Sequence, residues 1–240
     1  MQGQCRGYGA SAGPWAARYC CVALLLCLTL FFAASAFASQ TIYVGRGASA
    51  GDGLSADRPL SSINAALKKA RKGDVVVVAP GEYRESVQVS VWGVTVQGSV
   101  SEDNIPLVTI LPPAEKTASV LTDSTDTLWR GVGFHLAGRG AVTLRGFSGR
   151  FESCLFASSS PVPSIEVYGG NPVFQGCTFT GGTGPNALMA LNGQAGRKSG
   201  ATMAYCLFRD ISGGAVLLRG EQDVRFINCL FAACQFVTMR

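Results

Sequence analysis

A short phrase repeats along the second half of the chain and constrains the fold more than any other feature. The phrase ends in Phe, four of its five copies carry Cys two residues before that Phe, and the copies occupy 129–134, 151–156, 174–179, 203–208 and 226–231. Consecutive copies start 22, 23, 29 and 23 residues apart. Apolar residues alternate within the phrase, which is the period of a β-strand. A unit of this size cannot bury its apolar side alone, so we expect the copies to stack coil upon coil.

A second alternating phrase precedes the last four copies and ends at a glycine, at 142–146, 165–169, 189–193 and 216–220. Glycine suits the tight corner at which a strand ends. The longest interval contains a polar insertion, 193–200, which we expect to be a surface loop. Propeller blades need about 40 residues per unit, and leucine-rich repeats need a Leu/Asn pattern with a helical segment, so neither fits this chain. The repeat therefore predicts a solenoid of parallel strands.

Stacked coils place equivalent residues in columns, about 4.8 Å from coil to coil. Two inward columns follow from the repeat: Cys154, Cys177, Cys206 and Cys229, and two positions later Phe156, Phe179, Phe208 and Phe231. The Cys column could form a metal or redox site, but we favour a structural core ladder in which the thiols pack as small apolar groups. Parallel side chains also suit a disulfide torsion poorly. Residues 39–240 contain an odd number of Cys, five, so we expect Cys234 to be a free or intermolecular thiol.

The segment that precedes the repeats predicts a helix followed by a strand. Between 61 and 72, apolar residues at 63, 66, 67 and 70 share one helical face, and Gly73 is expected to end the helix. An uninterrupted β run follows at 75–78, and then a Pro80-Gly81 turn.

This order resembles the N-terminal segment of right-handed parallel β-helix proteins of the pectin-lyase-like superfamily. The matching residues are Pro59, Ile63, Ala66, Ala70, Gly73-Asp74, Pro80-Gly81 and Tyr83-Arg84-Glu85. The resemblance covers residues 42–231 and implies an all-β, right-handed parallel β-helix with a short N-terminal capping helix. In that superfamily the helix covers the open end of the first coil, where a bare parallel edge would invite association. We therefore expect one β-helix domain over 39–240, with about six or seven coils.

The first 38 residues predict export. The uncharged apolar segment 22–38 follows two Arg residues, at 6 and 18, and ends in Ala36-Phe37-Ala38, as a cleaved signal peptide over 1–38 does. The alternative is that the segment stays uncleaved and anchors the protein in a membrane. Its 17 residues are close to the shortest length that can span a bilayer. Without residues 1–38 the net charge is +3, from 18 basic and 15 acidic residues. That charge is too small to indicate nucleic-acid binding, and membrane contact is expected only through an uncleaved N-terminal segment. The predicted location is the periplasm, the outer membrane or cell surface, or the medium.

The sequence provides few candidates for catalysis. The resemblance implies that superfamily members which cleave acidic polysaccharides use clustered acidic residues, often with calcium, beside a basic residue. The acids of the repeat region occupy different repeat positions, namely Glu152, Glu166, Asp210, Glu221 and Asp223. Asp123 and Asp126 form a local acidic cluster, and we interpret their segment as a solvated loop rather than a calcium site. We therefore assign no catalytic residue, metal ligand or cofactor. The alternative is a polysaccharide lyase or glycoside hydrolase, for which calcium would be the candidate cofactor.

Binding has a clearer candidate. The residues before the four corner glycines are Arg145, Tyr168, Asn192 and Arg219. Stacking aligns them along one edge, with the two Arg about 14 Å apart. Guanidinium groups and an aromatic face in a line could bind a linear, acidic glycan. The alternative is that these exposed corner positions simply tolerate polar residues. The predicted role is a non-catalytic protein of the cell envelope or surface that binds a polysaccharide or a protein partner along its side.

One outward row is unusually apolar and contains Leu155, Thr178, Leu207 and Leu230. Aligned aliphatic residues on an outer face call for a covering segment or a partner. Only nine residues follow Phe231, without a polar cap. We expect either a partner or second copy over that coil, or a chain that is a fragment of a longer one.

Overall fold

The structure is a computed structural model, and it describes residues 39–47, 51–113, 120–123, 125–137, 141–159, 163–182, 187–193, 199–235 and 238–239. The predicted signal peptide and residues 194–198 of the insertion loop predicted at 193–200 lie outside these residues. Among the described residues, no helix is long and apolar enough to span a membrane.

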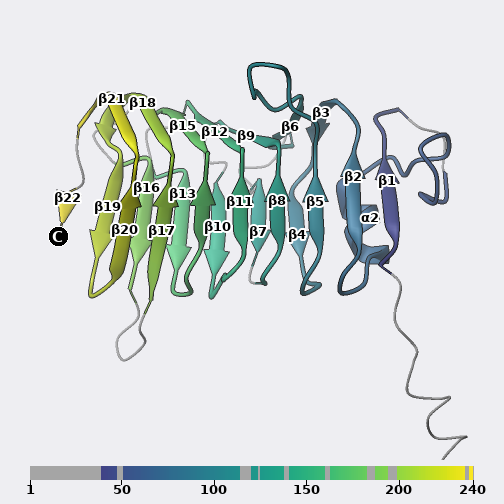
Figure 1. The fold of residues 1–240 in the computed structure, drawn as a ribbon, viewed down its shortest axis with the longest axis horizontal. Coiled ribbons are helices and arrows are strands. Elements are labelled where there is room, and N and C mark those ends of the chain that lie inside the picture. Colours follow the sequence, from purple (N-terminus) through teal and green to yellow (C-terminus); the bar gives the residue numbers. More distant parts are fainter. Residues whose placement is uncertain are drawn as a thin grey trace, which may run out of the picture. The chain divides into compact units, whose positions relative to one another are not determined.

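Three parallel sheets make up the domain (Figure 1). Sheet A contains β1 (Thr41–Val44), β2 (Val75–Val78), β5 (Thr95–Gln97), β8 (Leu128–Arg130), β11 (Arg150–Glu152), β14 (Val173–Gln175), β17 (Gly200–Ala204) and β20 (Asp223–Ile227). Sheet B contains β3 (Gly81–Arg84), β6 (Val108–Leu111), β9 (Val132–Leu136), β12 (Leu155–Ser158), β15 (Thr178–Gly181), β18 (Leu207–Gly214) and β21 (Leu230–Gln235). Sheet C contains β4 (Val87–Val89), β7 (Leu121–Asp123), β10 (Val142–Arg145), β13 (Ile165–Tyr168), β16 (Met189–Asn192), β19 (Val216–Arg219) and β22 (Thr238–Met239).

The chain visits the sheets in a fixed order. From β2 onward each strand of sheet A is followed by one of sheet B and one of sheet C, and this cycle occurs seven times in the described part. Each strand pairs in parallel with the equivalent strand one coil away, as β12 does with β9 and β15. The all-β parallel β-helix predicted from the repeat is therefore confirmed.

Single residues with positive φ turn the chain at the corners. Between sheets A and B the turning residue is Gly131, Ser153, Gly176, Tyr205 or Asn228 in five successive coils, with φ between 49° and 62°. At the corner between sheets C and A, three of the four glycines expected from the second phrase also have positive φ: Gly146, Gly169 and Gly220. Gly193 is needed for a different reason, because a Cβ there would lie 3.0 Å from the carbonyl oxygen of Glu221.

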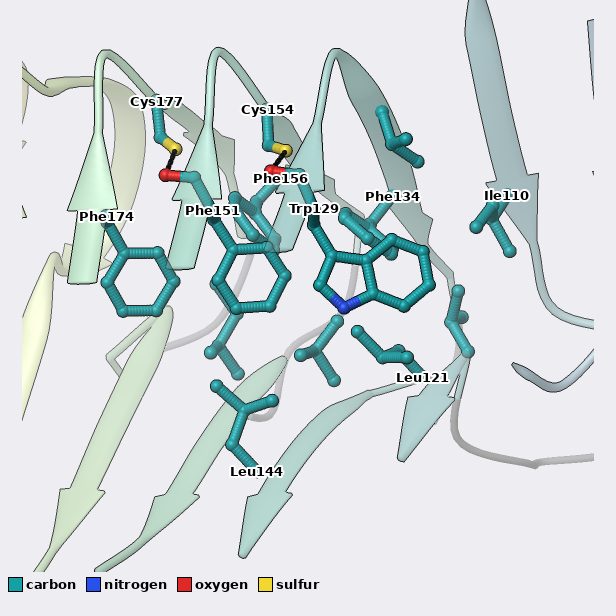
Figure 2. Packing of buried hydrophobic residues seen from close by; sticks show 14 of the residues in the cluster. Ile110, Leu121, Trp129, Phe134, Leu144, Phe151, Cys154, Phe156, Phe174 and Cys177 are labelled. Carbon is teal, nitrogen blue, oxygen red and sulfur yellow. Dashed lines mark hydrogen bonds between the residues drawn. The ribbon is translucent and has the colours of Figure 1, made fainter. Parts of the chain in front are cut away.

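Stacked aromatic side chains fill the core of the later coils. On sheet B, the Phe residues that end the five copies of the phrase form one column, with neighbouring ring centroids 4.6–5.1 Å apart and planes within 13° of parallel. On sheet A, Trp129, Phe151 and Phe174 form a second column (Figure 2). Rings of the two columns meet edge to face, as Phe151 and Phe156 do at 5.4 Å. Both arrangements are favourable for aromatic pairs.

The Cys residues of the phrase line the corner between sheets A and B. Cys154, Cys177 and Cys206 are buried, Cys229 is half-buried, and all four are free thiols. Each thiol lies within hydrogen-bond distance of a carbonyl oxygen of the preceding coil, as Cys177 does with Phe151 at 3.4 Å (Figure 2). Burial raises the pKa of the Cys177 thiol well above its ordinary value. The Cys177 thiol therefore stays protonated, and all four thiols are placed to act as weak donors to these carbonyl oxygens.

The predicted N-terminal helix is present as α2 (Ile63–Lys69), which is shorter than the predicted 61–72. The Ser62 hydroxyl caps it by accepting the N–H of Ala65 at 3.1 Å. The helix does not end at Gly73 as predicted. It ends at Lys69, and Ala70 is already extended, because the Asp74 carboxylate accepts the N–H of Arg71 at 2.7 Å and leads the chain into β2.

The helix covers the exposed edge of sheet C. The Asn64 side chain accepts the N–H of Gln88 at 3.1 Å and donates to the carbonyl oxygen of Ser86 at 2.9 Å. The Glu85 carboxylate accepts the N–H groups of Ile63 and Asn64, at 2.8 and 3.0 Å. Asn64 thus makes the bonds that a further strand would make with β4, so the capping helix predicted from the sequence is confirmed.

Candidate binding edge

The four residues predicted to bind lie side by side. Arg145, Tyr168, Asn192 and Arg219 are the last residues of β10, β13, β16 and β19, and successive members pair in register. The position before each of them belongs to one inward column, in which Leu144 and Leu191 are fully buried. Since side chains alternate along a strand, this burial directs the four residues outward. We call this row the C–A edge column.

Its first two side chains contact each other. The guanidinium carbon of Arg145 lies 4.7 Å from the centroid of the Tyr168 ring, which is a cation–π arrangement. Partial burial, and then the negative charge of Glu166, raise the pKa of Tyr168, while Arg145 and Arg219 lower it. The phenol therefore stays neutral at physiological pH and can donate a hydrogen bond.

The other two are also joined. An N–H of the Arg219 guanidinium donates to the Asn192 amide oxygen at 3.3 Å. The Asn192 amide nitrogen donates to the carbonyl oxygen of Val167, also at 3.3 Å. Among the described residues, no carboxylate lies within 4 Å of the guanidinium nitrogens of Arg145 or Arg219. The column therefore presents two oriented guanidinium groups whose charges are not neutralised by an ion pair within the described part of the chain.

The acidic residues of the repeat region lie apart. Glu152 is on the outer face of sheet A, between Arg130 at 2.8 Å and Arg150 at 3.4 Å. Asp223 pairs with Arg225 at 2.8 Å on the same sheet. Glu166 precedes Tyr168 on sheet C, Asp210 lies in β18 of sheet B, and Glu221 is exposed beyond the last corner glycine. Within the described ranges, no three His, Cys, Asp or Glu side chains are placed to hold a metal ion.

The interpretation of Asp123 and Asp126 as a solvated pair is wrong for Asp123. Asp123 occupies an inward position of β7, in register with Val89 and Leu144, and its side chain is fully buried. Its carboxylate accepts the hydroxyl and the N–H of Thr125 at 2.7 and 2.9 Å, and the indole N–H of Trp129 at 3.0 Å. Burial raises the pKa of Asp123, and these hydrogen bonds oppose the rise.

The burial of Asp123 has a structural reason. Thr125 and Thr127 are buried with it in the corner between β7 and β8, and their hydroxyls lie within hydrogen-bond distance of each other, at 2.6 Å. Asp126 instead is exposed and accepts the N–H of Gly93. The Asp123 carboxylate is therefore buried and the Asp126 carboxylate exposed, and both oxygens of Asp123 already accept hydrogen bonds. The detectable sequence signal was the alternation of Leu121 and Asp123, which puts both on the inward face.

The outward apolar row is only partly covered. Leu155, Thr178 and Leu207 are half-buried, whereas Leu230 in the last coil is 62% exposed. The segment between β5 and β6 reaches over the same row at Gly133, where a Cβ would lie 3.8 Å from Pro106. Cys234, the predicted free or intermolecular thiol, is free and half-buried, 3.7 Å from the carbonyl oxygen of Phe208.

Strand order, parallel pairing and stacked columns together identify the architecture. The chain is a parallel β-helix. No family model matches it, and no curated protein matches its sequence. Among solved structures, its backbone is similar to that of the pectin methylesterase from Aspergillus niger, with a TM-score of 0.47 and 12% sequence identity over 83% of this chain and 86% of that chain. The similarity is one of backbone path and says nothing about the chemistry of this chain.

Proposed function

We propose that this protein is an exported, non-catalytic β-helix of the cell envelope or surface, and that it binds a linear acidic glycan along the C–A edge column. The observation that carries the proposal is the in-register alignment of Arg145, Tyr168, Asn192 and Arg219. A straight row of donors with a constant step of about 4.8 Å suits a linear polymer better than a compact ligand.

The charges of the column favour an acidic ligand. The guanidinium groups of Arg145 and Arg219 form no ion pair within the described residues, and each can give paired hydrogen bonds to a carboxylate or sulfate. Tyr168 is half-buried with the Arg145 guanidinium over its ring, and it adds a neutral hydroxyl beside the two charges. The column therefore combines charge recognition with a neutral hydrogen-bonding group.

Two further observations support an exported binding protein. The apolar segment 22–38 has the composition of an export signal. Glycosidic hydrolysis uses two carboxyl groups on opposite sides of the scissile bond, about 5–10 Å apart. The acids of the repeat region lie on different sheets, and two of them, Glu152 and Asp223, are held by Arg residues. Binding without cleavage is the function that this arrangement supports best.

The test is a titration of the purified chain 39–240 with a panel of uronic-acid polymers. The double variant Arg145→Ala/Arg219→Ala should bind at least tenfold more weakly, because a hydrogen bond to a charged group contributes about 1.5–3 kcal/mol. The matched control is Arg84→Ala/Arg209→Ala, which removes the same charge from the outer face of sheet B. Equal affinities of the wild type and the edge variant, or an equal loss in both variants, would refute the proposal.

A further inference from the structure

An exposed tryptophan occupies the same edge of the β-helix, nearer the N-terminus. Trp92 lies in the corner between β4 and β5, which joins sheet C to sheet A, and its side chain is 56% exposed. The C–A edge column occupies the equivalent corners of later coils. The stacking of sheet C puts these corners on one side of the β-helix, since Val89, Asp123, Leu144 and Val167 pair in one register. Arg145 directly follows Leu144, whereas Trp92 lies three residues beyond Val89, further into the corner. Trp92 was not among the residues that the repeat indicated, because the first coil carries neither phrase.

The turn after α2 carries two basic residues, Arg71 and Lys72, and it meets the Trp92 corner. The N–H of Gly73 donates to the carbonyl oxygen of Gly93 at 2.9 Å, which joins the turn after α2 to the Trp92 corner. A Cβ at Gly93 would lie 3.0 Å from Cγ of Lys72, so the stem of Lys72 crosses the corner next to Trp92. Arg71 and Lys72 are both exposed. In the described part of the chain, neither has a carboxylate within 4 Å of its charged nitrogens.

One acidic group also faces the corner. Asp126 accepts the N–H of Gly93, which lies directly after Trp92. The corner therefore presents an indole, the Lys72 cation with the exposed Arg71 next to it in the chain, and one carboxylate. A sugar ring that carries an acidic group matches all three: the ring packs on the indole, its charge meets Arg71 or Lys72, and a hydroxyl can donate to Asp126.

We propose that Trp92, with Arg71 and Lys72, is a terminal subsite for the acidic glycan that binds the C–A edge column. The inference rests on the proposed function and extends it. From the coil of Trp92 to that of Arg219 there are five inter-strand steps in sheet C, so the ligand runs parallel to the stack of coils over about 24 Å. Recognition then depends on ligand length, because a short oligomer reaches only part of the edge.

The chain offers a direct spectroscopic readout. Of its three Trp residues, one precedes residue 39, so the chain 39–240 retains only Trp92 and Trp129. Trp129 is fully buried in the core. A change in fluorescence, or protection from a soluble quencher, on ligand addition therefore reports on Trp92.

The experiment titrates chain 39–240 with short and long oligogalacturonates, followed by fluorescence and calorimetry. Long oligomers should protect Trp92 from quenching, and Trp92→Ala should weaken their binding about tenfold while leaving short oligomers nearly unaffected. Arg71→Ala/Lys72→Ala should act in the same way. The matched control is Tyr205→Ala, which removes a 62% exposed aromatic side chain from a corner between sheets A and B. Thermal unfolding of each variant checks that the fold is kept.

The possible outcomes separate the two proposals. If Arg145→Ala/Arg219→Ala weakens binding while Trp92 fluorescence and Trp92→Ala show no effect, the terminal subsite is refuted and the edge column stands. If Trp92 responds but the edge variant binds like the wild type, the edge column is refuted and with it the continuous site. If Trp92 responds to vesicles of anionic phospholipid but not to oligogalacturonate, the corner contacts a membrane surface and the glycan subsite is refuted.

Discussion

The early and late coils of the β-helix build their cores from different side chains. In the coils before β8, the inward columns contain mostly aliphatic residues such as Val76, Val96 and Ile110. From Trp129 onward, aromatic rings stack from coil to coil in two facing columns, and Met203 is the one non-aromatic member, between Phe174 and Phe226 on sheet A. Repetition of the same ring at the same position lets neighbouring planes lie nearly parallel. The late coils therefore gain contact between identical neighbours, while the early coils depend on the helix cap and on general apolar packing.

The two kinds of core meet at a buried polar group. Asp123 takes the place of an aliphatic residue in the inward column of sheet C, in β7, the strand that directly precedes Trp129 in β8, and it accepts the indole N–H of Trp129. An indole in an apolar core needs an acceptor for its N–H. The difference between the two regions thus includes a specific polar junction between them.

The largest expected effect is in the aromatic core. Phe156→Ala removes a ring stacked on Phe134 at 5.1 Å and on Phe179 at 5.0 Å. It should lower the free energy of unfolding by about 3–5 kcal/mol, because a large buried cavity remains. The comparison is Val96→Ala in the aliphatic region, which removes fewer atoms and should cost clearly less. Urea unfolding measures both, and equal losses would show that stacking adds nothing to burial.

The junction should show a smaller effect that depends on pH. Asp123→Ala leaves the Trp129 N–H and the Thr125 hydroxyl without their acceptor and should cost about 2–3 kcal/mol. Because burial raises the pKa of Asp123 in the folded chain, the carboxyl favours folding most below its unfolded pKa. That advantage is lost as pH rises through the folded pKa. The stability of the wild type relative to Asp123→Asn should therefore decrease as pH rises above about 4. A constant difference across this pH range would contradict the assignment.

The smallest effect is expected at the cap of the aliphatic region. Asn64→Ala removes the two bonds from α2 to the edge of β4 and should cost about 1–2 kcal/mol, partly offset because Ala is the better helix former. The uncovered edge should also promote self-association, measurable by light scattering. Lys68→Ala, at an exposed position of the same helix, is the control. An Asn64→Ala chain as stable and as monomeric as the control would show that the edge is protected by other means.

The late coils were predictable because the same phrase recurs once per coil between residues 129 and 231. Residues at the same place in each copy of the phrase, such as Phe156 and Phe179, share a column, and parallel pairing then follows from stacking. The binding candidates were found for the same reason, since each precedes a corner glycine. The helix was located correctly, but its C-terminal end was not, because the Asp74 carboxylate ends it and apolar periodicity does not reveal such a contact.

Asp123 and Trp92 were not predictable in this way. A polar run between two strands looks like a solvated loop. The alternation of Leu121 and Asp123 is a weak signal against that interpretation, and the register of β7 with β10 shows that the Asp123 carboxylate is buried. Trp92 belongs to a coil without either phrase, so no spacing relates it to Arg145. The structure places the turn after α2 beside Trp92, because the N–H of Gly73 donates to the carbonyl oxygen of Gly93.

The sequence by itself determined the parallel β-helix, its coil period and its columns, because a phrase that recurs every 22–29 residues can bury its apolar side only by stacking. The tertiary structure alone decided which polar residue enters the core and which corners form one continuous edge. Those outcomes depend on contacts between coils of unequal length, and no local pattern in the chain records such contacts.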